Sequence, residues 1–208
     1  MNATEQNKSQ ANPHGIAHFI QQYYPQYWNK ICSYPAGQCA CIRKTTDEWG
    51  ILGNFGASPL TVDGVVFKNA EQLYQLMKFK DEEALKAIHS AGGMWIKRKA
   101  KHYEKEIRRP DWGRYFIDAL KFCLMTKYEQ CAAFRDALER SKGLYIIEDE
   151  TNRKKGEGQS ADAWGAKLIG DHYVGPSLLG QLLMELRDTG KLTYSLPADA
   201  LDFIQLLK

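Results

Sequence analysis

The feature that most constrains the fold is a turn-and-cap pattern in the first half of the chain. The stretch TVDGVVF, residues 61–67, places Asp63 and Gly64 between β-branched residues. This pairing is typical of a two-residue hairpin turn, in which both central residues need a positive φ. Asn69 follows directly, with a glutamine three residues later at the spacing of a capping box. We therefore expect a β-hairpin that leads straight into a helix over residues 69–81.

Most of the remaining chain has helical spacing of its apolar residues. The pattern predicts helices behind Pro13, from Asp81 to the Gly92-Gly93 pair, over about 94–108, from Asp111 past Cys123, over about 129–140 and over 177–190, and a short buried strand over 144–148. Residues 25–48 show no clear period, which predicts loop with possible short strands. Helices in this order, with only a hairpin and a strand, predict a mainly helical single α+β domain with a small β element.

The chain divides by composition into four predicted parts. Residues 1–12 are polar and predicted to be disordered, and 13–48 form an N-terminal extension of a helix plus a loop. The predicted main domain covers residues 49–190, and residues 191–208 form a tail that packs on it. A polar insertion between residues 149 and 161 is long enough to serve a site.

The composition excludes several classes of protein. With 44% hydrophobic and 25% charged residues, the chain is typical of a globular protein. It has no run of 18 apolar residues and no signal peptide, so we expect no membrane partner and an intracellular location, cytoplasmic or nuclear. The five scattered cysteines favour free thiols and give no zinc-binding pattern, so no metal is expected. The oligomeric state is left open.

Basic residues form two local clusters although the net charge is only +3. They occupy residues 97–109 and 153–155. Such runs are commonly solvated faces of a helix or loop, and they also suit contact with phosphates. The sequence keeps both interpretations.

The predicted helix over 69–81 carries an acid, an amide and a lysine at spacings that place them on one face. Glu71, Gln75 and Lys78 lie within about 60° of one another at 100° per residue. They form either a solvated stripe with a capping glutamate or one wall of a site. Further along, Asp162, Trp164 and Gly165 combine an acid, an aromatic plate and a flexible turn, which suits a ligand with a planar ring and a sugar.

Several segments in the same order resemble the NADAR family, also called YbiA-like. They are GNFGASPLTVDGVVFKNAEQLYQLMKF, IIED followed by DAWG, and LLGQLLMELRD. The resemblance covers about residues 49–190 and implies an N-glycosidase that needs no cofactor. Members hydrolyse N-glycosidic bonds in early riboflavin-pathway intermediates, and others remove ADP-ribose from guanine in DNA or RNA.

The sequence departs from the family pattern at three places. The stretch Gly175-Pro176-Ser177-Leu178-Leu179-Gly180 has a hydroxyl where many members have an amide. Where many members have Trp-Gly-x-Gly, this chain has Trp164-Gly165-Ala166-Lys167, and its loop between Glu148 and Asp162 is longer. The second and third changes concern the choice of substrate more than the chemistry.

The resemblance and the residue types together give a candidate site. The predicted catalytic residues are Lys78, Glu71 and Asp162, and the predicted substrate-binding residues are Asn54, Phe55, Gln75, Trp112, Glu148, Trp164, Gly165 and Ser177. A neutral Lys78 would replace the amine at the sugar C1 through a Schiff base. The alternative is a carboxylate that activates water.

The predicted partner is ADP-ribosylated guanine in DNA or RNA, with ADP-ribose as the product. A riboflavin-pathway ribosylamino-pyrimidine is the alternative substrate. A module that binds ADP-ribose without hydrolysis is the alternative function.

Overall fold

The computed structural model describes residues 16–27, 30–152 and 164–208. In chain order the helices and strands are α1 (Ile16–Tyr23), β1 (Cys32–Pro35), β2 (Cys39–Ile42), β3 (Leu60–Val62), β4 (Val65–Phe67), α2 (Ala70–Leu76), α3 (Glu82–Ser90), α4 (Trp95–Ile107), α5 (Trp112–Gln130), α6 (Ala132–Arg140), β5 (Tyr145–Glu148), β6 (Lys167–Ile169), β7 (His172–Gly175) and α7 (Leu178–Thr189). The predicted α+β class, mainly helical with small sheets, is confirmed. The predicted disordered tail, 1–12, lies outside the described residues.

The predicted hairpin forms between β3 and β4. Asp63 and Gly64 have φ values of 47° and 82°, as the two-residue turn requires. Asn69 caps α2 by accepting a hydrogen bond from the backbone N–H of Gln72. The Gln72 side chain does not complete a capping box with Asn69. Its oxygen accepts from the Lys68 N–H instead, and its amide group donates to carbonyls at the end of α3, because α3 packs against this turn of α2.

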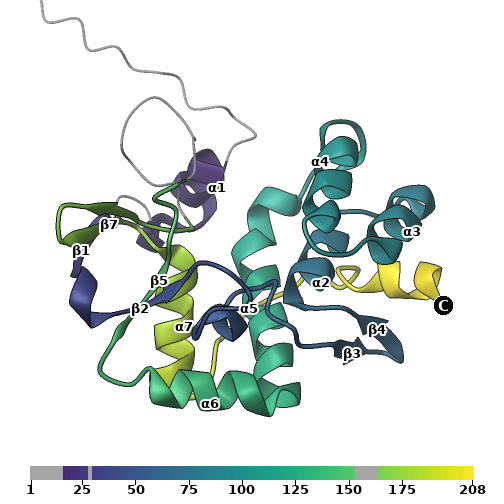
Figure 1. Cartoon of the computed structure of the whole chain (residues 1–208). Helices are drawn as coiled ribbons and strands as arrows, with labels where there is room; N and C mark the ends of the chain where they lie inside the picture. Colours follow the sequence, from purple (N-terminus) through teal and green to yellow (C-terminus); the bar gives the residue numbers. More distant parts are fainter. Residues whose placement is uncertain (1–15, 28–29, 153–163) are drawn as a thin grey trace, which may run out of the picture.

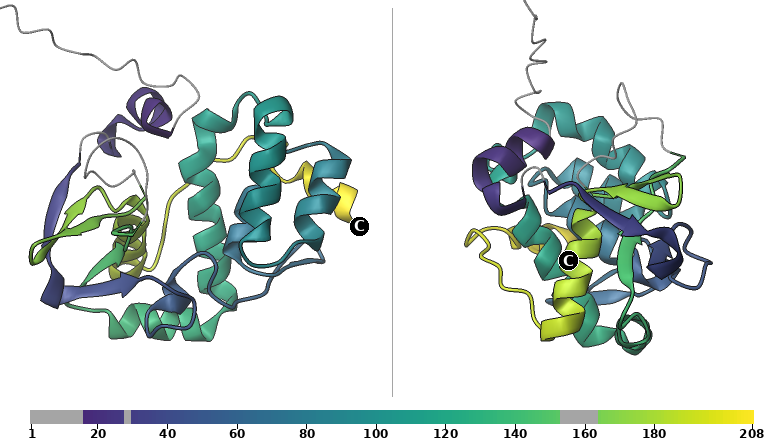
Figure 2. Two further views of the ribbon diagram at one scale, coloured as in Figure 1. Left: turned by 45° about the horizontal axis from the view of Figure 1, so that its top comes forward. Right: turned by 90° about the vertical axis from the view of Figure 1, so that its left-hand side faces the viewer.

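Helix α5 stands in the middle of the molecule and separates two groups of elements (Figures 1 and 2). On one side, α2 packs against α3, α4 and α5. On the other side lie α7 and the strands β1, β2, β5 and β7. Every residue of α2 is buried. This short helix is therefore enclosed on all sides, and its polar residues lie inside the protein.

The strands form three small sheets, most of which the sequence did not reveal. Strands β1, β7 and β6 form an antiparallel sheet in that order, and β2 pairs with β5 in parallel. Strands β1 and β2 lie in the segment for which the sequence predicts loop with possible short strands. Because both pair with strands from the C-terminal half, residues 32–42 belong to the same sheets as residues 145–175.

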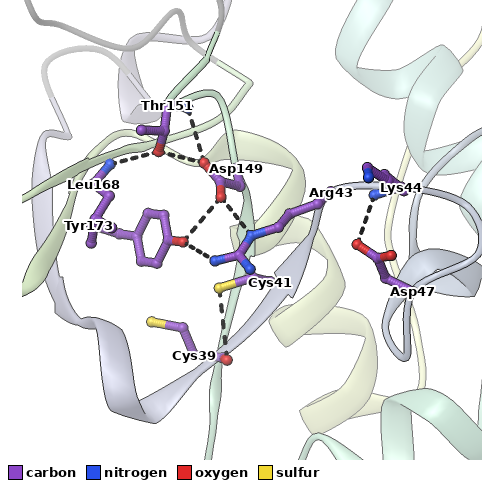
Figure 3. Close-up of polar contacts among 9 residues, drawn as sticks. All are labelled: Cys39, Cys41, Arg43, Lys44, Asp47, Asp149, Thr151, Leu168 and Tyr173. Carbon is purple, nitrogen blue, oxygen red and sulfur yellow. Dashed lines mark hydrogen bonds and ion pairs between the residues drawn. The ribbon is translucent and has the colours of Figure 1, made fainter.

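A network of polar side chains ties the parallel pair to the antiparallel sheet (Figure 3). Asp149, directly after β5, accepts hydrogen bonds from Arg43 Nε at 2.7 Å and from the Tyr173 hydroxyl on β7 at 3.0 Å. Arg43 also donates to that hydroxyl, and Thr151 Oγ1 joins Asp149 to the Leu168 N–H on β6. Burial raises the pKa of Asp149, but these hydrogen bonds together lower it by more, so the pKa lies below its ordinary value. The charged carboxylate thus fixes the end of β5.

The C-terminal segment after α7 packs against the helical side. Leu192, Ala200, Phe203 and Ile204 are buried in the main hydrophobic core, the last two in the 3-10 helix η4 (Asp202–Leu207). The five cysteines are free. Within the part of the chain that the structure describes, no helix is long and apolar enough to cross a membrane.

Candidate active site

The polar side chains at α2 are buried in the interior. Glu71, Gln75 and Lys78 are 2%, 5% and 8% exposed. Charged residues are almost never this buried unless they are paired. The burial excludes the solvated stripe that the sequence left open, and it leaves the catalytic role of these residues as a prediction.

Lys78 does not lie in the helix, so its predicted helical position was wrong. Helix α2 ends at Leu76, and the carbonyl of Lys78 accepts a hydrogen bond from the Arg109 backbone N–H at 2.9 Å. The turn is tight, however, since the Lys78 N–H donates to the Gln75 carbonyl at 3.4 Å. Lys78 therefore stays close enough to Glu71 to feel its charge.

Two acid–lysine pairs connect α2 and the turn that follows it with α4 across the site. Lys78 Nζ lies 3.5 Å from Glu104 Oε1, and Lys97 Nζ lies 3.4 Å from Glu71 Oε1. Gln75 Nε2 donates to the same Glu71 oxygen at 2.7 Å. Glu104 and Lys97 were not predicted. Their seven-residue separation places them on one face of α4, and that signal was hidden in a run of charges that also fits a solvated surface.

Aromatic rings surround the lysine. The Tyr74 ring contacts Trp112 at a centroid distance of 5.2 Å and Trp164 at 6.3 Å. Lys78 Nζ lies 5.6 Å from the Trp112 ring centroid and 5.8 Å from that of Tyr74, close enough for cation–π attraction. Tyr74 is a further residue that the sequence did not reveal. We call the following set the lysine site: Glu71, Tyr74, Gln75, Lys78, Lys97, Glu104, Trp112 and Trp164.

The environment of Lys78 favours its neutral form. Burial lowers the pKa of Lys78, and the nearby carboxylates of Glu104 and Glu71 only partly oppose this shift. A lysine with a lowered pKa holds more of the neutral amine, which is the nucleophilic form. Burial and the charge of Glu71 raise the pKa of Tyr74 well above its ordinary value, so its hydroxyl keeps its proton.

The predicted Asn54-Phe55 pair lies directly against this site. The Asn54 carbonyl accepts the Glu71 backbone N–H at 2.9 Å, and the Phe55 ring centroid lies 5.2 Å from Lys97 Nζ. The side-chain oxygen of Asn54 is buried without a hydrogen-bond partner among the described residues. Such atoms are rare in proteins and suit a donor group from a ligand.

A buried lysine on α5 holds the loop that carries Asn54. Lys127 is fully buried, and its Nζ donates to the carbonyls of Ile51 and Gly53 at 2.6 and 2.8 Å. The ring centroid of Phe134 lies 4.7 Å from the same nitrogen. Burial lowers the pKa of Lys127 to about 7. No local pattern indicates this clamp, because the residues that it joins are far apart along the chain.

The other predicted binding residues form a second group on the side of the strands. Glu148, Gly165 and Ser177 are joined through the backbone: Ala166 N–H donates to the Glu148 carbonyl, and Ser177 N–H donates to the Gly165 carbonyl, both at 2.9 Å. A Cβ at Gly165 would lie 2.5 Å from the Glu148 carbonyl oxygen. Only glycine permits this approach. The group meets the lysine site at Trp164.

Ser177 precedes α7 as predicted, but it does not cap the helix with its side chain. Its φ is 43°, in the left-handed region, and its side chain makes no capping hydrogen bond. The Oγ atom is buried without a partner among the described residues. Like the Asn54 oxygen, it is a free polar atom close to predicted binding residues.

One predicted catalytic residue lies outside the part of the chain that the structure describes. Asp162 lies outside the described residues, as does the basic cluster 153–155. Within residues 16–27, 30–152 and 164–208, no group of three or more His, Cys, Asp or Glu side chains could hold a metal ion.

Comparison with known proteins identifies the family. The model of the NADAR domain matches residues 42–189. The chain belongs to the NADAR family. Every residue of the lysine site lies within the part that the NADAR model matches.

Relatives and a solved structure of the family agree with this assignment. The N-glycosidase YbiA of Escherichia coli strain K12 is 30% identical over 145 residues, which cover 69% of this chain and 83% of that protein. The N-glycosidase YbiA of Shigella flexneri serotype 5b is 29% identical over the same length. The NMR structure of E. coli YbiA matches with a TM-score of 0.58 and 28% identity, covering 73% of this chain and 83% of that one. The predicted family is confirmed.

Proposed function

We propose that this protein is an N-glycosidase that hydrolyses the bond between a ribosyl C1 and an amine, and that it removes ADP-ribose from guanine in nucleic acid. The observation that carries the proposal is Lys78, a buried lysine with a lowered pKa, held between carboxylates and aromatic rings. The naming of the YbiA relatives as N-glycosidases supports the reaction class. ADP-ribosylated guanine as the substrate is our own addition to that reaction class.

The lysine site suits an exchange of amines at C1. A glycosylamine opens its sugar ring to an imine, and a neutral Lys78 can then replace the base as the amine bound to C1. Water later releases the sugar from the lysine. In this scheme Glu71 bonds sugar hydroxyls or transfers protons, and Asp162 protonates the ring oxygen or the departing base.

Substrate binding would use atoms and rings around the lysine site. The side-chain oxygens of Asn54 and Ser177, which have no hydrogen-bond partner among the described residues, are available to hydrogen-bond the ligand. Trp112, Trp164 and Phe55 offer ring faces for the base and the adenine. Gln75, Glu148 and Gly165 complete the proposed contacts, with Gly165 allowing a close approach of the backbone.

The exposed side of α4 supports a nucleic-acid substrate. Trp95 is 60% exposed, and the Arg98 guanidinium lies 4.9 Å from its ring centroid. Lys101 and Lys105 are exposed at the following turns of the same helix. Lys97, which pairs with Glu71 in the lysine site, precedes Lys101 by one turn of α4, so a strand bound along α4 would pass beside that site. Stacking on a tryptophan and phosphate contacts by basic residues are the usual means of holding a single strand.

The test uses an oligonucleotide that carries ADP-ribosylated guanine. Wild-type protein and the Lys78→Met variant are incubated with it, with and without borohydride, and released ADP-ribose and protein mass are measured. We expect several equivalents of ADP-ribose from the wild type, none from Lys78→Met, and a borohydride-dependent adduct on Lys78. Release without an adduct favours the alternative in which a carboxylate activates water. At most one equivalent of product would indicate a binding module.

Two further measurements address the kind of substrate. Charge reversal at Arg98, Lys101 and Lys105 should weaken binding of the oligonucleotide and flatten its salt dependence, because phosphate contacts release counterions. The exposed Glu106→Gln variant on the same helix serves as the control. If the oligonucleotide is not cleaved and a ribosylamino-pyrimidine is, without salt dependence, the small-molecule alternative replaces the proposal.

A further inference from the structure

Glu104 is the carboxylate placed against the ammonium of the proposed nucleophile. Among the described residues, its Oε1 is the carboxylate oxygen within ion-pair distance of Lys78 Nζ, at 3.5 Å. We infer that Glu104 accepts a proton from Lys78 before the lysine attacks C1, and returns it to the departing amine. The inference rests on the proposed function and adds a catalytic residue to it.

Glu71 is the other carboxylate near Lys78, and its contacts make it less suited to this task. Its Oε1 already accepts a hydrogen bond from Gln75 and pairs with Lys97. Its side chain is only 3% exposed, whereas that of Glu104 is 28% exposed. Glu104 can therefore exchange a proton with solvent after each turnover. Glu71 is held in one position by its two partners, which suits an orienting or charge-balancing role.

The charged groups around Lys78 come from two helices that pack against each other, α2 and α4. Glu71 belongs to α2, while Glu104 and Lys97 belong to α4. Arg108, the residue directly after α4, donates to the same Glu104 oxygen at 3.1 Å. Arg108 fixes the orientation of the Glu104 carboxylate, so that its oxygen stays directed at Lys78. The Tyr74 hydroxyl, with its raised pKa, does not compete for the proton.

The protons that leave Lys78 go to the departing base, and water restores the lysine ammonium at the end of the turnover. The Lys78 ammonium gives a proton to the Glu104 carboxylate, and the neutral Nζ forms a bond to C1 of the open-chain imine. The π pair of the C1=N bond moves to the base nitrogen, which takes one proton from Nζ. The C1–N bond to the base then breaks, its electron pair stays on the base nitrogen, and that nitrogen takes the proton back from Glu104. This leaves a C1=Nζ iminium. Water adds to C1 and its two protons pass to Nζ. The C1–Nζ bond breaks with its electron pair on Nζ, which restores the lysine ammonium, and the sugar is released as its aldehyde, which closes to the ring.

The first experiment measures how the charge of Glu104 affects the pKa of Lys78, and it needs no glycoside. Lys78 is labelled with formaldehyde and cyanoborohydride across a pH series in the wild type, Glu104→Gln and Glu106→Gln, and the peptide is quantified by mass spectrometry. Because the Glu104 charge raises the pKa of Lys78, its loss should move the midpoint of labelling down by about 1 pH unit or more. The exposed Glu106 on the same helix should have no effect. Equal midpoints in all three proteins would overturn the inference.

The second experiment measures turnover on the substrate established for the wild type. We expect Glu104→Gln to lower the rate about 100-fold with unchanged substrate affinity, as for loss of a general acid–base group. Added formate should raise the turnover rate of Glu104→Ala at least about tenfold, and it should leave the turnover rate of Glu106→Ala unchanged. Wild-type turnover by Glu104→Gln overturns the inference and keeps the proposed function. A wild type that cleaves no N-glycoside overturns the proposed function and, with it, the assigned proton transfer, whatever the labelling shows.

Discussion

Replacing Lys127 by methionine should change how the stability of the protein depends on pH. Burial lowers the pKa of Lys127 from 10.5 to about 7 in the folded state, and the unfolded chain regains the ordinary value. Between these values the unfolded state binds more protons than the folded state, so the free energy of unfolding rises with pH. The rise is about 1.4 kcal/mol between pH 6 and pH 8, and about 5 kcal/mol over the whole interval.

The structure explains why the neutral amine is accepted at this position. A neutral lysine has two N–H groups, and the carbonyls of Ile51 and Gly53 receive them at 2.6 and 2.8 Å. A methionine side chain would leave both carbonyls without that donor, so the Lys127→Met variant should also lose about 2 kcal/mol at pH 8.

The assay is urea unfolding followed by tryptophan fluorescence at several pH values between 6 and 8. Other groups titrate in this range, and they do so equally in the wild type and in Lys127→Met, so the difference between the two curves isolates Lys127. Lys101→Met, on the exposed side of α4, provides a matched control that should run parallel to the wild type. If the curve of Lys127→Met also runs parallel, Lys127 does not lose its proton in this range and the reasoning is wrong.

Two further predictions concern packing and capping. In Gly180→Ala, the new Cβ would lie 1.8 Å from the Ile146 carbonyl oxygen, so α7 and β5 must move apart. We expect the free energy of unfolding, measured by thermal unfolding, to fall by about 3 kcal/mol or more. A fall of less than about 1 kcal/mol would contradict this prediction. Asn69→Ala and Asp81→Ala each remove a side-chain cap from a helix start and should each cost about 1 kcal/mol in urea unfolding with an unchanged slope. Wild-type stability in either variant would show that water replaces the cap.

The elements that could be predicted are those determined by neighbouring residues. The Asp63-Gly64 turn forms because both residues tolerate positive φ, and Asn69 and Asp81 cap the helices that follow them. In each case the atoms that interact lie within a few residues of each other. Apolar periodicity identified α5 for the same reason.

The parts that could not be predicted depend on residues far apart in the chain. Strands β1 and β2 are only four residues long, and their partners lie beyond residue 144. The contacts of Lys97 with Glu71 on α2 and of Glu104 with Lys78 after α2 likewise arise from the packing of α4 against this segment. Lys78 was placed on a helix that ends earlier, because Asp81 starts a new helix and the chain must turn before it.

The pairing of β2 with β5 has a consequence for synthesis on the ribosome. Cys39 lies opposite Tyr145, so β2 emerges about a hundred residues before its partner exists. Helices α2 to α6 lie between these strands in the sequence and make local contacts, which form quickly. Helix α2, the turn after it that carries Lys78, and α4 with Glu104 can therefore assemble before β2 has a partner strand. Chains halted before β5 would present an unpaired strand edge, so chaperones should bind them at this stage.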